Sequence, residues 1–251
     1  MFIEKKPLAL LLMCIILAGC ATATYTSLVS ESFAPSAKDP EVFFVAPDRP
    51  FQIIGLVEAR GSTYTTHAKL IKLLKAKARK KGADAIYVSL GEKQVPFYSS
   101  FYGIYTVLSK PRAYALALRY KEGNVIETKK IIGQWIGRGT STVVGEFMLV
   151  ATINENKGGI SGILTASTGL SGIIRGYIEN NSIELLAFPS NPRYCLLKFV
   201  GFYDGKDSIK GQYSSVFCSV SEGGVIEMKR SEATKPIEQI EKPKIRGSGE
   251  I

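Results

Sequence analysis

Between Val125 and Arg230 the chain alternates short apolar runs with turn residues, and this pattern limits the fold more than any other feature. β-Branched and aromatic residues fill the runs, and no helical period is visible. We interpret the runs as strands over residues 125–132, 143–154, 160–167, 171–179, 182–188, 194–203, 208–219 and 224–230. Consecutive antiparallel strands of this length predict an all-β barrel or sandwich over residues 125–230.

Turn residues and a weak internal repeat support this interpretation. Asn180-Asn181 and Asp204-Gly205 tolerate the positive φ that tight hairpins need. An apolar-x-Gly pattern recurs at Ile160, Ile174, Phe199 and Ile209. Glycine inside a strand marks a bend or a close approach of backbones, so the repeat favours a curved sheet.

The chain's one tryptophan, Trp135, stands between Gly133 and Gly137. We expect it to plug one end of the barrel. A tryptophan with neighbouring glycines near the first strand resembles the calycin group of barrels, which often bind apolar ligands. That resemblance implies a ligand cavity, whereas a barrel of this size can also be filled by its own side chains. The sequence leaves both alternatives open.

Residues 41–121 predict a small α/β domain in front of the barrel, so the expected fold class is α+β. Its expected elements follow the order β-β-α-β(-β), at residues 41–45, 51–59, 65–81, 83–89 and 113–120. Thr65 or Thr66 can cap the helix, and Gly82 ends it.

The helix also carries the first candidate binding surface. Lys69, Lys72 and Lys80 belong to a basic face that could bind anionic lipid or polymer. The alternative is a face that is merely solvated.

The second candidate surface is an aromatic stretch between two expected strands, formed by Phe97, Tyr98, Phe101, Tyr102 and Tyr105. Tyrosine supplies contact area at low entropic cost, so this stretch is a candidate for partner recognition. It could equally pack on itself as a small core, or extend the flanking strands into a hairpin.

The N-terminus has the pattern of a secretory signal peptide over residues 1–19. Lys5 and Lys6 precede an uncharged apolar run, which closes with Leu17-Ala-Gly-Cys20. This tetrapeptide resembles the lipobox of bacterial lipoproteins. The resemblance implies that Cys20 becomes the lipidated, palmitate-bearing N-terminus of a protein of the bacterial envelope and periplasm, on a membrane face that the sequence leaves open. Ala21, in place of the aspartate that favours inner-membrane retention, implies the outer membrane.

The α/β domain also resembles small domains of envelope lipoproteins. Gly55-Leu-Val-Glu, followed by a Lys- and Ala-rich helix that runs into Gly82-Ala-Asp-Ala-Ile, is similar to the arrangement in the stress-sensor lipoprotein of the Rcs phosphorelay. The extra cysteines of that sensor are absent here. We therefore take from the resemblance an expectation about the fold and none about residue roles.

Cys195 and Cys218 are the cysteines that remain after Cys14 is removed with the signal peptide and Cys20 is lipidated. In an oxidising compartment they most simply form one disulfide, and their spacing matches two strands joined by a hairpin. Two free thiols are the alternative. With His67 as the one histidine and no Cys-x-x-Cys, we expect no metal site and no cofactor.

The remaining segments lack the pattern of folded structure. Residues 20–40 are rich in Ser, Thr and Ala and predict a flexible tether, and residues 231–251 predict a disordered tail. The net charge of +10 fits anionic lipid, lipopolysaccharide or cell-wall polymer, or serves solubility alone. An envelope location argues against a nucleic-acid partner.

The sequence contains no nucleophile elbow, phosphate-binding loop or dinucleotide fingerprint, so we do not expect an enzyme. The first functional hypothesis is a membrane-anchored, non-catalytic binding, assembly or sensing module, whose partner is an envelope protein or an anionic polymer. The alternatives are a carrier of an apolar ligand inside the barrel and a glycan hydrolase.

Overall fold

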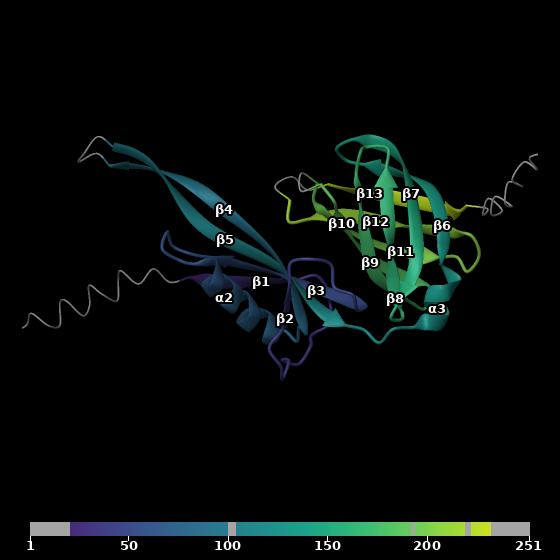
Figure 1. Ribbon diagram of the computed structural model, residues 1–251, viewed down its shortest axis with the longest axis horizontal. Coiled ribbons are helices and arrows are strands. Elements are labelled where there is room, and N and C mark those ends of the chain that lie inside the picture. Colours follow the sequence, from purple (N-terminus) through teal and green to yellow (C-terminus); the bar gives the residue numbers. More distant parts are fainter. Residues whose placement is uncertain (1–20, 100–103, 192–193, 219–221, 232–251) are drawn as a thin grey trace, which may run out of the picture.

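The computed structural model describes residues 21–99, 104–191, 194–218 and 222–231. It contains a five-stranded sheet with one helix, followed by a closed eight-stranded antiparallel barrel (Figure 1). The predicted α+β class is confirmed, and of the two all-β alternatives the barrel is the correct one.

The sheet has the strand order β1-β3-β5-β4-β2. Its elements are β1 (Thr22–Ser27), β2 (Glu41–Phe43), β3 (Phe51–Arg60), α2 (His67–Arg79), β4 (Ala85–Ser99) and β5 (Ile104–Tyr120). β2 runs parallel to β4, and the other pairs are antiparallel.

The predicted helix is confirmed, with slightly narrower bounds. The Thr66 side chain caps α2 by accepting a hydrogen bond from the backbone N–H of Lys69 at 3.3 Å. Leu70, Leu74 and Ala78 form its buried stripe and pack against one face of the sheet. Gly82, which follows the helix, has φ +81°, a conformation that glycine adopts without strain.

The expectation of a flexible tether over residues 20–40 is wrong for residues 22–27. Strand β1 pairs with β3 along its whole length, and Thr22 lies opposite Arg60. The Tyr25 hydroxyl donates to the Ile54 carbonyl at 2.9 Å. Threonine and tyrosine favour strands, so this segment has a β propensity that its Ser/Thr/Ala-rich composition concealed.

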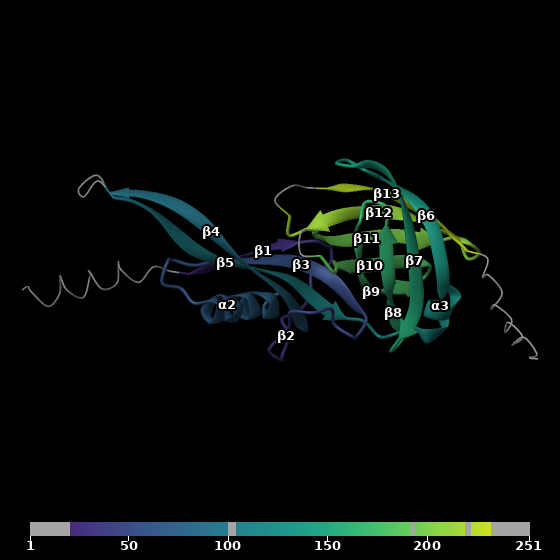
Figure 2. The same ribbon diagram turned by 45° about the horizontal axis from the view of Figure 1, so that its top comes forward.

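Strands β4 and β5 extend far beyond the predicted strands at 83–89 and 113–120. Their pairing continues from Ala85 and Leu118 to Ser99 and Ile104. β3 accompanies them only as far as the pair of Arg60 with Arg112. Past this point the two strands form a two-stranded projection (Figures 1 and 2), which we call the ribbon, residues 91–99 and 104–112.

The ribbon shows how the backbone of the aromatic stretch is arranged, which the sequence left open between a small core packed on itself and a hairpin. Phe97, Tyr98 and Tyr105 lie within its paired strands, so the stretch extends the flanking strands into a hairpin. Phe101 and Tyr102 lie outside the described residues.

The barrel is an up-and-down meander in which each strand pairs with the next, and β13 closes the ring against β6. Its elements are α3 (Val125–Lys130), β6 (Gly133–Ser141), β7 (Gly145–Asn156), β8 (Gly159–Ala166), β9 (Ser171–Glu179), β10 (Ser182–Pro189), β11 (Leu196–Tyr203), β12 (Ser208–Val216) and β13 (Gly223–Arg230).

The strand expected at residues 125–132 is wrong, because this segment contains the short helix α3. Asn124 caps α3 by accepting a hydrogen bond from the backbone N–H of Glu127 at 3.1 Å. The capping asparagine, an acidic first turn and two lysines at the end outweigh the β propensity of Val125 and Ile126.

The sequence did not predict β6, because its three glycines weaken the strand pattern. At Gly137 a Cβ atom would lie 2.2 Å from the Glu227 carbonyl of β13. Only glycine permits this approach, so the residue that obscured the strand also allows the barrel to close.

The sheet lies between α2 on one face and the barrel on the other. Phe51, Ile53, Leu116 and Leu118 of the sheet share a buried cluster with Leu186, Phe188 and Leu196 of the barrel. Rings of Tyr87 and Phe188 meet edge to face, with centroids 5.1 Å apart. The two parts therefore form one packed body.

A partly buried carboxylate adds polar contacts to this interface. Glu184 accepts a hydrogen bond from the Ile53 backbone N–H at 3.2 Å and pairs with Lys198 at 3.3 Å. The glutamate thereby joins a strand of the sheet to the barrel wall.

We predict that Phe188→Ala lowers the free energy of unfolding by about 3–5 kcal/mol, because the ring is 8% exposed and fills the interface between sheet and barrel. Phe202→Ala is the matched control, since Phe202 is 55% exposed on the same barrel, and its effect should stay within about 0.5 kcal/mol. Urea unfolding of both variants measures the difference. Equal losses would contradict the assigned interface.

Candidate apolar-ligand cavity

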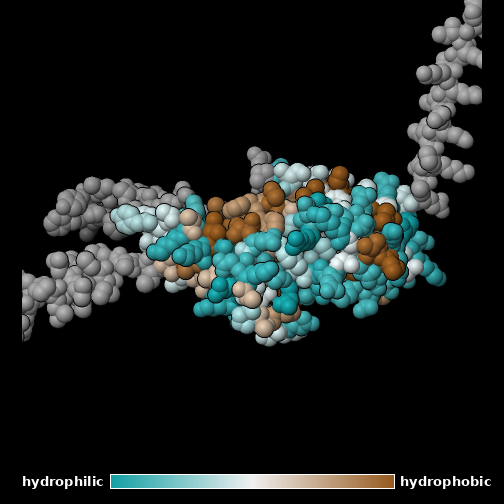
Figure 3. All heavy atoms as spheres, turned by 60° about the horizontal axis from the view of Figure 1, so that its bottom comes forward, coloured by the Kyte–Doolittle hydropathy of each residue, from teal (hydrophilic) through white to brown (hydrophobic). Residues whose placement is uncertain are grey.

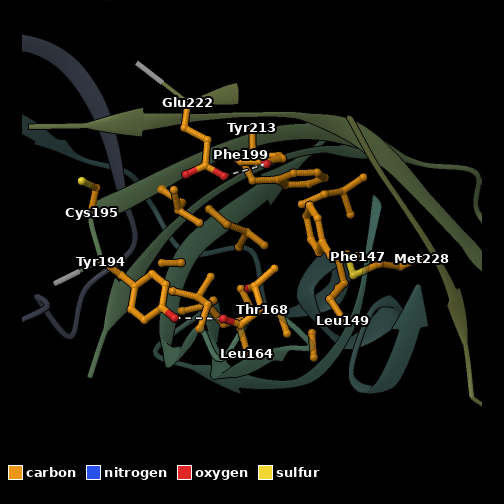
Figure 4. Close-up of a pocket in the computed structure, with 18 of the residues that line it drawn as sticks. Phe147, Leu149, Leu164, Thr168, Tyr194, Cys195, Phe199, Tyr213, Glu222 and Met228 are labelled. Atoms are coloured by element: carbon orange, nitrogen blue, oxygen red, sulfur yellow. Dashed lines mark hydrogen bonds between the residues drawn. The ribbon is translucent and has the colours of Figure 1, made fainter. Parts of the chain in front are cut away.

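The barrel encloses a cavity of about 120 Å³, which is the candidate functional site (Figure 4). Inward-facing positions of its strands supply mainly aliphatic and aromatic side chains. Those central to the wall are Phe147, Leu149, Ile174, Leu185, Phe199 and Met228. Because alternate residues of each strand face inward, the pleat itself creates this apolar lining.

One end of the barrel is closed by Trp135, as predicted. The indole is fully buried, and its Nε1–H donates to the Ile131 carbonyl at 2.8 Å. The ring of Tyr203 meets it edge to face, with centroids 6.0 Å apart. This end therefore offers no path for a ligand past the indole.

Arg230, the last residue of β13, fixes the closed end. Its guanidinium carbon lies 4.6 Å from the centroid of the Trp135 ring. The same group donates hydrogen bonds to the carbonyls of Lys130 and Ile132, at the end of α3. Arg230 thus joins the closing strand β13 to the Trp135 plug and to α3. The sequence did not indicate this role, because Arg230 stands at the end of an expected strand and belongs to no motif.

The other end of the barrel is open and carries the polar groups of the site. Figure 4 shows Tyr194 and Thr168 on one side of the opening and Glu222 with Tyr213 on the other. The Tyr194 hydroxyl donates to the Thr168 carbonyl at 2.9 Å. We call this opening the mouth; Val144, Thr168, Tyr194 and Glu222 line it.

Glu222 is the one charged residue among the described residues that line the cavity. Its carboxylate accepts hydrogen bonds from Ser141 at 2.8 Å and from the Tyr213 hydroxyl at 3.3 Å. Ser141 in turn accepts from the backbone N–H groups of Val143 and Val144. The carboxylate therefore holds the β6–β7 turn at the mouth, and burial raises the pKa of the Tyr213 hydroxyl beside it.

The predicted disulfide between Cys195 and Cys218 is confirmed and lies at the mouth. The two Cα atoms are 5.9 Å apart, and Cys195 contributes to the cavity wall. The bond joins the residue before β11 to the segment after β12. It thereby closes the ends of a hairpin that forms part of the rim.

The cavity can bind a slim apolar group. Its volume is close to the ~150 Å³ of engineered apolar cavities that stay dry and take up benzene. A wall with so few polar atoms offers a ligand little besides apolar contact, so binding would be driven by removing hydrocarbon from water. Among the described residues, no group of His, Cys, Asp and Glu side chains is placed to hold a metal ion.

The sequence-based candidates lie away from the cavity. Lys69, Lys72 and Lys80 are exposed on α2, on the face of the sheet opposite the barrel, and their binding role stays a prediction. The aromatic positions Phe97, Tyr98 and Tyr105 lie on the ribbon, and Cys20 lies outside the described residues.

The sequence did not indicate two parts of the site, the empty interior of the barrel and Glu222. Periodicity indicated a barrel but not whether its interior is filled. Glu222 escaped because it lies between two expected strands and belongs to no motif. The calycin-like Trp135 was the one signal that pointed to a cavity.

Comparison of the chain with models of known protein families finds no match, and neither does comparison with curated proteins. Within the described ranges, no helix has the length and apolar character needed to cross a bilayer.

We predict that Cys195→Ser lowers the free energy of unfolding by about 3 kcal/mol, because a loop of 23 residues loses its cross-link. Hydrogen exchange should rise most at the mouth, in the segments before β11 and after β12. Equal exchange throughout the barrel would contradict a local role for the disulfide at the rim.

Proposed function

We propose that this chain is a lipid-anchored protein of the bacterial envelope that holds a slim apolar ligand in its barrel without catalysing a reaction. The single observation that carries the proposal is the apolar cavity, closed by Trp135 and open at the mouth. Of the three functions that the sequence allowed, the carrier is the one that this cavity supports best.

The side chains that line the cavity argue against a glycan hydrolase. Such an enzyme uses a pair of carboxylates that flank the scissile bond. Among the described lining residues Glu222 is the one carboxylate, and Ser141 and Tyr213 already occupy it with hydrogen bonds. A sugar would also meet a wall that offers few hydrogen bonds.

The chemistry of the mouth narrows the ligand class. An alkyl chain fits a narrow apolar cavity, and its polar head would lie at the mouth beside Glu222. Because like charges repel, Glu222 disfavours a carboxylate head. We therefore expect long-chain alcohols or amines to bind more tightly than fatty acids of equal length.

The position of the mouth supports exchange of the ligand with a membrane. Phe217, in the segment after β12, lies 6.0 Å from Tyr114 of β5, measured between ring centroids. Tyr114 is two residues from Arg112, where the ribbon begins and where the first strand of the chain also starts. An anchor at Cys20 would hold this end of the sheet near the bilayer.

We predict that Ala151→Leu abolishes binding of a long-chain alcohol while leaving the barrel as stable as before or stabilising it by about 0.5–2 kcal/mol. Ala151 is buried in the cavity wall, and the larger side chain fills empty space. Thr152→Leu is the matched control, since the neighbouring residue is exposed and should leave binding unchanged. Calorimetry and thermal unfolding measure the two effects. Undiminished binding by Ala151→Leu would place the ligand elsewhere.

We predict that Cys20→Ala prevents incorporation of radiolabelled palmitate and lowers the share of the protein in the membrane fraction. The anchor needs a thiol at the residue that becomes the N-terminus. Cys14→Ala, which removes a cysteine of the signal segment, should change neither readout. Palmitate incorporation that persists in Cys20→Ala would exclude the proposed anchor.

A further inference from the structure

The ribbon is too long and too apolar to be explained by the sheet from which it projects. From Glu92 to Ser99 it extends eight residues past the last pair of β3, or about 26 Å at 3.3 Å per residue. An isolated two-stranded hairpin is only marginally stable in water. Such a projection therefore calls for a further contact.

The sequence of the ribbon indicates what that contact is. The sixteen residues 94–109 include no charged residue, in a chain that is 22% charged. Apolar types occupy consecutive positions, for example Val95 to Tyr98, without the polar alternation of a strand that has one face in water. Tyrosine is typical of membrane–water interfaces, and Tyr98 lies opposite Tyr105 in the register.

Lysines flank this uncharged segment on both strands. Lys93 lies directly opposite Lys110, a like-charge pair that destabilises a hairpin in water. Anionic headgroups would neutralise both charges at the level where the apolar positions begin. The order of residue types along the ribbon, basic and then aromatic and aliphatic, thus matches the order of layers met when approaching an anionic bilayer.

The start of β1 shows that the ribbon lies near the proposed lipid anchor. Thr22 lies opposite Arg60, and Arg60 lies opposite Arg112, so β1 begins at the sheet end from which the ribbon projects (Figures 1 and 2). Cys20 precedes Thr22 by two residues, which span at most about 7 Å. The proposed lipid anchor and the ribbon therefore share one end of the molecule.

We propose that the ribbon, through residues 93–99 and 104–110, is a second membrane contact that lies in the headgroup region of the bilayer holding Cys20. This inference rests on the proposed anchor. The ribbon binds the lipid surface by its uncharged positions, and Lys93 and Lys110 pair with anionic headgroups. Together with the anchor it fixes the orientation of the barrel above the membrane.

The length of the ribbon and the reach from Cys20 to β1 together limit how the ribbon can lie in the bilayer. If the ribbon stood perpendicular to the bilayer, its outer end would lie about 19 Å below the surface, because the anchor allows a gap of only about 7 Å. That depth is past the headgroup layer and within the hydrocarbon core. A ribbon has two unpaired edges, which hydrocarbon does not tolerate. The ribbon therefore lies obliquely, with its edges among headgroups and water.

Figure 3 shows one face of the molecule, on which apolar residues gather mainly in the middle and at the end away from the ribbon, while polar residues cover most of the remainder.

Quenching of tryptophan emission by brominated lipids tests the proposal. Phe97→Trp and the control Phe202→Trp each add one indole to the full lipidated protein, whose own Trp135 is buried. Each variant is placed in vesicles of phosphatidylethanolamine and phosphatidylglycerol with bromine near the headgroup end or at the middle of the acyl chains. We expect the emission added by Phe97→Trp to shift to the blue and to be lost mainly to the shallow bromines. The emission added by Phe202→Trp should be unaffected.

The outcomes separate this proposal from the one on which it rests. If mass spectrometry shows no lipid at Cys20, the proposed anchor is overturned, and the ribbon proposal is overturned with it. A lipidated, vesicle-bound chain in which Phe97→Trp is not quenched overturns the ribbon proposal alone. So does efficient disulfide capture of two copies through Ser99→Cys without quenching in the Phe97→Trp chain, since the ribbon would then pair with a second copy.

A charge reversal tests the lysines separately. In the Phe97→Trp chain, Lys93→Glu with Lys110→Glu should remove most of the quenching in vesicles that contain phosphatidylglycerol. Lys206→Glu with Lys229→Glu changes the charge equally at exposed positions of the barrel and should leave the quenching intact. Equal quenching in both double variants would overturn the headgroup contact of the lysines. Retained emission of Trp135 confirms that each variant is folded.

Discussion

Each strand of the barrel has two neighbours because β13 pairs with β6, and the rest of the structure depends on this closure. Gly137 lets the two backbones approach, and Arg230 binds the Trp135 plug and the end of α3 from the closing strand. A ring without edges satisfies its own backbone, so its interior can remain apolar and partly empty. The barrel wall also gives the sheet a surface to pack on, through Phe188 and Leu186.

The closed ring, the anchor and the ribbon give one account of how the molecule works. In the proposed function the closed end would retain a ligand, and the mouth lies beside the base of the ribbon through the contact of Phe217 with Tyr114. If Cys20 and the ribbon both hold the bilayer, the mouth stays near the surface from which an alkyl chain would come. Glu222 serves two purposes in this account, because it orders the rim and selects the head of the ligand.

Periodicity in the sequence was sufficient for the fold class, the helix at residues 67–79 and most barrel strands, and the number and spacing of the cysteines were sufficient for the disulfide. Periodicity failed for residue types that occur both in loops and in strands. Threonine and serine at residues 22–27 indicated a tether but form β1, and the glycines of β6 concealed a strand whose closure requires them. The cavity depends on how side chains of eight strands fill a ring, which no local pattern encodes. Glu222 reaches Ser141 across 81 residues of sequence, so sequence spacing did not indicate it.

The most direct test of the central claim is methyl NMR spectroscopy of the barrel during titration with a long-chain alcohol. The account predicts saturable shifts of the inward methyl groups of Leu149, Ile174 and Met228, with no change at Ile163, whose side chain is exposed on the outer wall. Shifts confined to Ile163 and other outer residues would contradict it, because the alcohol would then bind the surface of the barrel and not its interior.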